Sequence, residues 1–312
     1  MRNFWVTDFG ANNVSMIYYN NNTLAKKILN ATTGAYTYGL VAAGSGPAGV
    51  AITPNGQYIY VANHLSNTVS VISTSSNSVV STITVGNNPW GVAITPNGQY
   101  VYVVNNANSG SVSVISTATE SVIATIPVSV YPGSVAITPN GQYAYVGNTN
   151  DIVSVISTAS NSVVANINVS TNTRCISIAP NGQYVYVVND APNGAVSVIS
   201  TATNSVVATI PVGSFPWGMA ITPNGKYLYV SNYNNNTVSV ISTATNSVVA
   251  TISVGTSPRD IAITLNGQYA YVTNFNGNTI SVISTASNSV VTTITGTPAN
   301  PWSINYGPLV GG

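Results

Sequence analysis

The chain has 312 residues, of which 45% are hydrophobic and only 4% are charged, and its net charge at pH 7 is +1. A typical globular protein carries about 25% charged residues, so the polar surface here must be built mainly from Asn, Ser, Thr and Tyr. The near-neutral charge argues against a nucleic-acid footprint spread over the surface, and no apolar run is long enough to predict a membrane span.

The first residues of the chain predict strands but no complete repeat. Residues 2–8 align with residues 57–63 further along, and residues 14–17 and 24–28 have the composition of two more strands. Pro47 then follows Ile28 by nineteen positions, whereas Pro89 follows Ile83 by six. We therefore expect a long loop at residues 29–46, of the kind that is often functional in compact domains.

From residue 47 onward the sequence repeats itself. The tetrapeptide NGQY or NGKY ends at six tyrosines spaced 41–43 residues apart, namely Tyr58, Tyr100, Tyr143, Tyr184, Tyr227 and Tyr269. Each unit holds four runs rich in Val, Ile, Thr and Tyr, which are typical of strands. Between the first two runs of one unit, Thr95-Pro96-Asn97-Gly98 has the residues that a type I turn prefers.

Four antiparallel strands in every unit of about 42 residues predict the blades of a β-propeller. We expect an all-β fold with seven blades in one domain, residues 1–312, of which six blades are whole repeats. The seventh would combine residues 2–29 with residues 301–306. The C-terminal strand would thus join the N-terminal blade and close the ring, leaving no exposed radial end.

Three segments carry a family resemblance: YVANHLSNTVSVIST, YVSNYNNNTVSVIST and YVTNFNGNTISVIST. They resemble the YVTN repeat of seven-bladed propellers, a family that includes archaeal surface-layer proteins and other exported proteins. The resemblance implies a location outside the cell or on its surface, with other surface proteins or glycans as partners. Propellers of similar outline also serve as lactonases, lyases and cofactor-bearing dehydrogenases, so the resemblance is specific for the fold rather than for the activity.

Rare residues gather at one position of the repeat, directly after the Pro (Thr173 in one unit) that opens each first strand. In ring order the residues at this position are Ala48, Trp90, Gly133, Arg174, Trp217, Arg259 and Trp302. In a propeller this position lies at the mouth of the central channel, on the face that we call the top face. The large side chains either plug the channel or form a ligand-binding ring of Trp90, Arg174, Trp217, Arg259 and Trp302. Such a ring could stack on a sugar or an aromatic group and hold a carboxylate or phosphate.

Five further residues are candidates on the top face: His64, Asp190, Asp260, Tyr233 and Phe275. Each Asp could instead cap a loop or neutralise an Arg. No compact acidic cluster predicts a metal site, and nothing predicts a cofactor. Cys175 follows Arg174, whose positive charge could lower the thiol pKa, but no partner base can be named, so no catalytic residue is predicted.

These observations favour a non-enzymatic surface or extracellular propeller that acts as a structural and interaction module. Its top face would bind other proteins or glycans, and nucleic acid is not expected as a partner. The alternative is an enzyme, a metal-assisted propeller of the lactonase or lyase kind.

Overall fold

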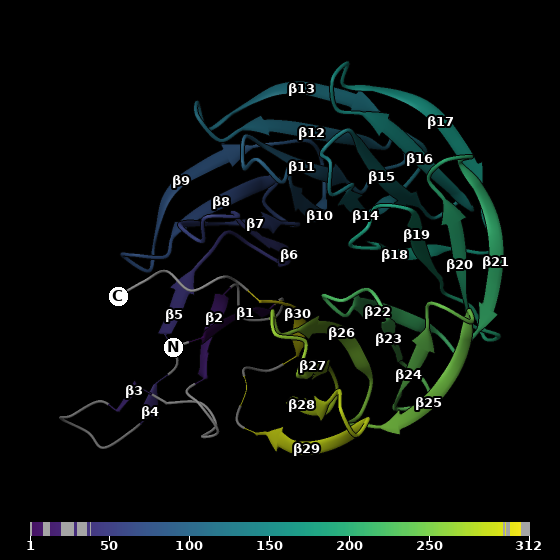
Figure 1. Ribbon diagram of the computed structural model, residues 1–312. Coiled ribbons are helices and arrows are strands. Elements are labelled where there is room, and N and C mark those ends of the chain that lie inside the picture. The colour runs from purple at the N-terminus through teal and green to yellow at the C-terminus, as the bar shows by residue number, and fades with distance from the viewer. Residues whose placement is uncertain are drawn as a thin grey trace.

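The computed structural model describes residues 2–8, 13–19, 28–29, 36–37, 39–295, 297 and 300–306. All regular secondary structure in these ranges is β-strand. Within the same residues, no helix is long and apolar enough to cross a membrane. The strands form small sheets that stand side by side around a central axis (Figure 1).

Among the described residues, six of the sheets consist of four consecutive strands each. The first and innermost strands are β6 (Pro47–Ile52), β10 (Pro89–Ile94), β14 (Pro132–Ile137), β18 (Thr173–Ile178), β22 (Pro216–Ile221) and β26 (Pro258–Ile263). The second strands are β7 (Tyr58–Asn63), β11 (Tyr100–Asn105), β15 (Tyr143–Asn148), β19 (Tyr184–Asn189), β23 (Tyr227–Asn232) and β27 (Tyr269–Asn274). The third strands are β8 (Thr68–Ser73), β12 (Ser111–Ser116), β16 (Ile152–Ser157), β20 (Ala195–Ser200), β24 (Thr237–Ser242) and β28 (Thr279–Ser284). The fourth strands are β9 (Ser78–Thr84), β13 (Ser121–Pro127), β17 (Ser162–Asn168), β21 (Ser205–Pro211), β25 (Ser247–Ser253) and β29 (Ser289–Ile294).

Neighbouring strands within each of these sheets pair antiparallel, as in β11, where Tyr102 lies opposite Val114 of β12. An all-β propeller with four antiparallel strands in each blade is therefore confirmed. The turn between the first two strands also forms as predicted, because the Gly98 N–H donates to the Thr95 carbonyl oxygen at 2.8 Å. Gly98 has a φ of 72° there, a left-handed conformation that glycine adopts without a steric penalty.

The two ends of the chain meet in one further sheet, in the order β30-β1-β2-β5. Its strands are β30 (Pro301–Tyr306), β1 (Arg2–Asp8), β2 (Asn13–Tyr19) and β5 (Gly39–Ala42). The C-terminal strand thus pairs with the N-terminal one, with Val6 opposite Ile304. In Figure 1, β30 lies beside β1, between the β26–β29 blade and β6.

The prediction that residues 24–28 form the fourth strand of this sheet is wrong. Gly39–Ala42 occupies that place, while β3 (Ile28–Leu29) pairs with β4 (Tyr36–Thr37) in a separate hairpin. Val41 stands six residues before Pro47, as Ile83 stands six before Pro89, and both side chains are 5% exposed. The extra residues therefore precede the fourth strand instead of following it. Of the loop expected at residues 29–46, residues 30–35 and 38 lie outside the described residues.

The hydrophobic core lies between the faces of adjacent blades. In one cluster Tyr60 and Val71 of one blade pack with Val101, Val103 and Ile115 of the next. Burial of each such aliphatic side chain stabilises the fold by about 1.5–3 kcal/mol. Six equivalent second-strand tyrosines are the largest buried side chains: Tyr60, Tyr102, Tyr145, Tyr186, Tyr229 and Tyr271.

Several of these tyrosines also connect one blade to the next by a hydrogen bond. The hydroxyl groups of Tyr102 and Tyr145 donate to the Oδ1 atoms of Asn161 and Asn204, at 2.8 and 2.9 Å, and Tyr229 does the same to an equivalent Asn. Each of these Asn residues belongs to the turn between the third and fourth strands of the following blade. Asn204 has a φ of 48°, which Asn tolerates better than most residues.

We predict that Tyr145→Phe lowers the free energy of unfolding by about 1 kcal/mol, because Asn204 loses its hydrogen-bond donor. Urea unfolding measures the effect. Tyr186→Phe is the matched control, since Tyr186 is equally buried but donates to no Asn among the described residues. Equal losses in the two variants would contradict a specific contribution of the Tyr145 hydrogen bond.

Candidate functional site

The channel mouth is shaped by a repeated irregularity at the start of each first strand. In β26, Pro258 lies opposite Asn274, but the next regular pair is Ile261 with Val272, so two residues face one. This β-bulge takes Arg259 and Asp260 out of the regular ladder, as bulges beside functional sites often do. Register shifts occur at the same place in the other first strands, including β30 around Trp302.

The side chains that follow the opening Pro meet at this mouth in a continuous series of contacts. His64 lies edge-on against Trp90, with ring centroids 4.7 Å apart, and Trp90 contacts Trp302 at 5.4 Å. Phe275 packs against Trp302 at 5.5 Å, and Tyr233 packs against Trp217 at 5.8 Å. The two tryptophans Trp90 and Trp302 can meet because the blade between them carries only the small Ala48.

Arg259 lies at the centre of this aromatic series. Its guanidinium carbon is 3.0 Å from the ring centroid of Trp302, 4.0 Å from that of Trp217 and 5.0 Å from that of Phe275. The residue is 4% exposed, and its Nε has no hydrogen-bond partner among the described residues. Burial lowers the pKa of Arg259 to about 9, so the guanidinium is still charged at neutral pH. The aromatic faces provide its main stabilisation.

Arg174 also packs on the ring of Trp217, with its guanidinium carbon 4.5 Å from the ring centroid. Its Nε donates to the Asp190 Oδ2 at 2.7 Å, and the Asp190 side chain is nearly buried, whereas that of Arg174 is 34% exposed. The contact of this ion pair is made by the Nε. Asp190 thus neutralises and orients an Arg, one of the two roles considered for it.

Asp260 is held by hydrogen bonds from three donors. Its Oδ2 accepts from the Ser303 hydroxyl at 2.7 Å and from the Ile304 N–H at 3.0 Å, and its Oδ1 accepts from the Ile261 N–H at 2.9 Å. Burial raises the pKa of the Asp260 carboxyl above its ordinary value of 3.8, although these hydrogen bonds and Arg259 act in the opposite direction. A carboxyl group with a raised pKa beside a cavity is typical of a functional site.

A cavity of about 110 Å³ lies at the mouth, with Trp90, Arg174, Cys175, Asp260 and Trp302 among its walls. Its lining comes from the first and second residues after the opening Pro or Thr173. The second residues are Gly49, Gly91, Ser134, Cys175, Gly218, Asp260 and Ser303. At Gly218 a Cβ would collide with the Arg259 carbonyl oxygen and crowd the Asp260 carboxylate, so glycine is required for Asp260 to lie there.

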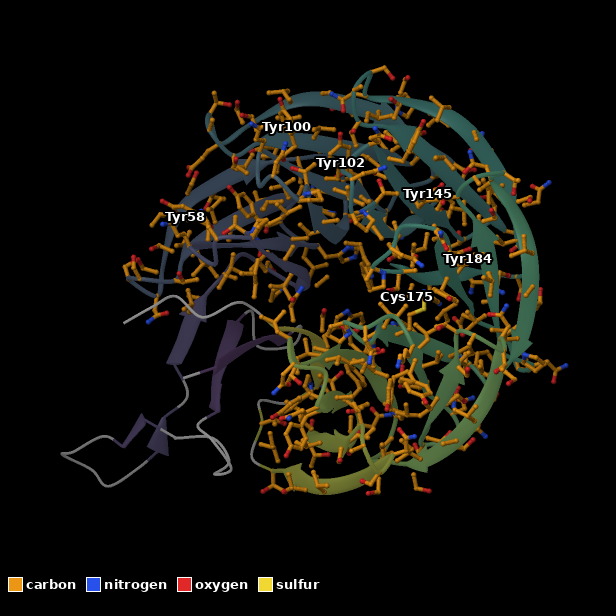
Figure 2. All side chains as sticks on the ribbon, in the orientation of Figure 1. Tyr58, Tyr100, Tyr102, Tyr145, Cys175 and Tyr184 are labelled. Carbon is orange, nitrogen blue, oxygen red and sulfur yellow. The ribbon has the colours of Figure 1, made fainter. Side chains whose placement is uncertain are left out.

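Cys175 lies on the inner side of the ring of blades (Figure 2). Burial raises the pKa of its thiol to about 12, with a further contribution from the negative charge of Asp260. The suggestion that Arg174 lowers this pKa is therefore wrong, because desolvation of the thiolate and the charge of Asp260 raise it.

Metal donors do not converge at this site. Across the part of the chain that the structure describes, no three His, Cys, Asp or Glu side chains are grouped so that they could hold a metal ion. The lining of the cavity offers one carboxylate and one thiol, and the thiol is protonated. Divalent cations in proteins generally need more oxygen, nitrogen or thiolate ligands than these.

The sequence missed the contribution of the second residue after the Pro. Ser303 and Asp260 share this place in neighbouring blades, and their hydrogen bond joins residues 43 positions apart in the chain. A comparison of the second position across the repeats would have pointed to Ser134, Cys175, Asp260 and Ser303, since glycine occupies it elsewhere.

The sequence model of the family described as "Lactonase, 7-bladed beta-propeller" matches residues 3–123 and 200–300, more than half of the chain. The chain belongs to this lactonase propeller family. A second model, "Cytochrome D1 heme domain", matches residues 101–219 of this lactonase-family propeller. No curated protein matches the sequence.

Solved structures resemble this lactonase-family propeller in fold. Hydrazine synthase of Kuenenia stuttgartiensis has a TM-score of 0.77 at 22% identity, over 92% of this chain and 93% of that chain. A functionally unknown protein from Desulfotomaculum acetoxidans has a TM-score of 0.82 at 17% identity, over 98% of this chain and 99% of that one. At these identities the likeness shows the fold alone.

The residues at the mouth do not fit a haem. Haem iron is held in proteins by His, Met, Tyr or a Cys thiolate. Met219 packs in the hydrophobic core, and Cys175 is a protonated thiol. Tyr233 packs against Trp217, and the only His of the chain, His64, packs against Trp90; both lie outside residues 101–219. A cavity of about 110 Å³ is also well below the volume of a typical cofactor pocket. We therefore derive no step through a haem.

The expectation of a non-enzymatic structural or adhesion module is wrong. The lactonase family model, which matches more than half of the chain, overturns it, because that family is described by an enzyme activity. The expectation was based on the repeat motif and on the charge-poor surface. The motif reports on the fold and the surface on the solvent-facing residues, and neither describes the chemistry of the channel mouth.

We predict that Cys175 resists alkylation in the folded protein. With a pKa of about 12, about one thiol in ten thousand is ionised at pH 8. Iodoacetamide labelling followed by mass spectrometry should show no modification of the native chain over hours and rapid modification in urea. Rapid labelling of the native chain would mean that the thiol is ionised or open to solvent.

Proposed function

We propose that this propeller is a hydrolase that opens a small lactone at the channel mouth. The observation that carries the proposal is the cavity in which Asp260 and Arg174 both form part of the wall, in a chain of the lactonase family. The cavity is small, so it suits the reacting ring, while any substituents of the substrate would lie against Trp90, Trp217 and Trp302.

Asp260 is the general base in this proposal. Its two oxygens offer about four acceptor sites, of which three are filled by Ser303, Ile304 and Ile261, so a water molecule in the cavity can donate to the remaining one. The three donors fix the orientation of the carboxylate. The raised pKa makes the ionised carboxylate a stronger base than an ordinary surface Asp.

Arg174 stabilises the negative charge that develops on the carbonyl oxygen of the lactone. Asp190 holds the guanidinium through Nε at 2.7 Å, and Trp217 supports its face, so the group is oriented before substrate binds. A preorganised donor of this kind contributes more to the transition state than a mobile surface cation. Arg259 adds positive potential from behind Trp217 and Trp302.

The proposed reaction balances with water as the only co-substrate. The water oxygen attacks the carbonyl carbon while Asp260 takes one of its protons, giving a tetrahedral intermediate whose oxyanion faces Arg174. The ring C–O bond then breaks, and the leaving alkoxide takes the proton from Asp260. The product is a hydroxycarboxylic acid, which ionises in solution. No metal or haem takes part in these steps.

We also infer that the ring has seven blades within a single domain of residues 1–312. Support comes from the sheet β30-β1-β2-β5, which adds to the six blades of consecutive strands, and from the description of the matching family as seven-bladed. The YVTN-repeat resemblance and the extracellular location that it implies stay predictions from the sequence.

We predict that the wild-type chain hydrolyses γ-butyrolactone or δ-valerolactone, measured by pH-stat titration of the acid released. Asp260→Asn should lower the rate by about a hundredfold or more, because the amide cannot accept the proton of the water. The ionised carboxylate is the active form, so the rate should rise with pH through a pKa above 3.8 and this limb should be absent in the variant.

Asp151→Asn is the matched control, because Asp151 accepts a backbone N–H from Asn172 and does not line the cavity. It should leave the rate unchanged. A wild-type chain inactive on both lactones, or an Asp260→Asn variant as active as the wild type, would overturn the proposal, provided that circular dichroism shows each variant to be folded.

We further predict that dialysis against EDTA leaves lactone hydrolysis unchanged, since no three metal donors converge in the described part of the chain. The rate before and after dialysis, and after re-addition of Zn²⁺, Mg²⁺ or Ca²⁺, tests this. Loss of activity with EDTA and recovery with one ion would instead favour a metal-assisted lactonase.

A further inference from the structure

A second pocket lies away from the channel mouth, between the β6–β9 blade and the β10–β13 blade. It is formed by the turns at the opposite end of the first strands, and its volume is about 440 Å³. Asn55, Tyr58 and Tyr60 line it from one blade, and Asn97, Thr117 and Glu120 line it from the next. Figure 2 shows Tyr58 on the outer part of the first of these two blades.

Glu120 breaks the pattern of the repeats at this place. The equivalent residue of the turn between third and fourth strands is Asn in the other five blades of consecutive strands, at Asn77, Asn161, Asn204, Asn246 and Asn288. All of them, and Glu120, have a φ between 48° and 51°. Asn tolerates this left-handed conformation, whereas Glu does so at a cost. The substitution is therefore unfavourable for the turn itself.

The substitution also changes the contact between the blades. Where Asn161 and Asn204 accept a hydrogen bond from the tyrosine of the preceding blade, Tyr60 donates none to Glu120. The Tyr60 residue is only 1% exposed. Burial, together with the charge of Glu120, raises its pKa to about 12, so the hydroxyl remains protonated. Among the residues that line the pocket there is no Lys or Arg, and Glu120 is the one charged group.

We propose that this pocket binds a small organic cation, a protonated aliphatic amine. The Glu120 carboxylate supplies the counter-charge, and the Thr117 hydroxyl, which donates its proton to the Gly98 carbonyl oxygen, can accept a further N–H donor. The exposed ring of Tyr58 provides aromatic surface for the alkyl chain and for the cation. The titratable groups that line the site are Glu120, Tyr58 and Tyr60.

Other ligand classes fit this pocket less well. A divalent metal needs several oxygen ligands, usually more than one carboxylate, around a site far smaller than 440 Å³. A neutral sugar would desolvate the Glu120 carboxylate without supplying a compensating positive charge. The site shares no residue with the lining of the channel cavity, so the proposal stands independently of the lactonase activity.

The test is isothermal titration calorimetry of the full chain with butylammonium chloride at constant ionic strength, with 1-butanol as the uncharged analogue. We expect saturable binding of butylammonium to the wild type and none of 1-butanol. Glu120→Gln keeps the size of the side chain and removes its charge, and it should weaken butylammonium binding by about tenfold or more. Glu120→Asn restores the residue of the other blades, so it should fold normally, gain thermal stability and lose binding to the same extent.

Tyr60→Phe separates the contribution of the hydroxyl from that of the ring and should weaken binding less than the two Glu120 variants do. Two results would overturn the proposal: a wild type that does not bind butylammonium, or equal affinities of the wild type, Glu120→Gln and Glu120→Asn. Binding of 1-butanol with the same affinity as butylammonium would also overturn it, because the pocket would then be recognising the alkyl chain alone.

Discussion

The channel mouth depends on the bulge that follows the opening Pro of each first strand. Because two residues there face one on the second strand, both leave the regular ladder, and side chains that would alternate between faces can line one cavity. The bulge brings Arg174 and Cys175 to the mouth from one blade, and Arg259 and Asp260 from another. A regular strand at this place would send one member of each pair between the blades, where the core lies.

The bulge is itself held by a buried network that the YVTN-like motif supplies. The Asn that ends each second strand lies opposite the opening Pro and is almost completely buried, and its amide group donates to a Ser of the third strand, as Asn232 does to Ser239 at 2.9 Å. Buried polar groups of this kind specify one register of the strands, since a shift would leave them unpaired. The motif Asn therefore helps to shape the channel mouth by fixing the register of the strands from within the blade.

Charge is scarce in this chain, and much of what there is lies at the mouth. Only 4% of residues are charged, yet Arg174, Asp190, Arg259 and Asp260 lie together around one small cavity. With few charges elsewhere on the surface, little competes with the electrostatic potential of this cluster, and its low-dielectric aromatic walls reduce screening. The low charge content of the chain therefore suits the proposed site, which would attract and polarise a small substrate.

The repeats allowed the blades, the turn at Thr95 and the meeting of the aromatic and Arg residues to be predicted from the sequence. Properties that arise only from packing were not predictable. The direction of the Cys175 pKa shift depends on how fully the thiol is desolvated, and the role of Asp260 depends on Ser303, a neighbour in the ring but distant in the chain. The fourth strand of the closing sheet was misplaced because an insertion in an irregular repeat can lie on either side of a strand, and only the burial of Val41 decides between them. The function was misjudged because a repeat motif reports on the scaffold.

The sheet that joins the two ends of the chain has a consequence for the time at which the site becomes complete. Trp302, Ser303 and Ile304 belong to β30, the last described strand, and they supply an aromatic wall for Arg259 and two of the three donors to Asp260. A nascent chain can stack its internal blades while β30 is still in the ribosome, since domains begin to fold from the N-terminal end during synthesis. In that intermediate the Asp260 carboxylate lacks two of its three hydrogen-bond donors. The complete site at the channel mouth forms only when β30 pairs with β1. The proposed hydrolysis therefore requires the pairing of β30 with β1, and a misassembled open ring would lack it even with most of its blades correctly folded.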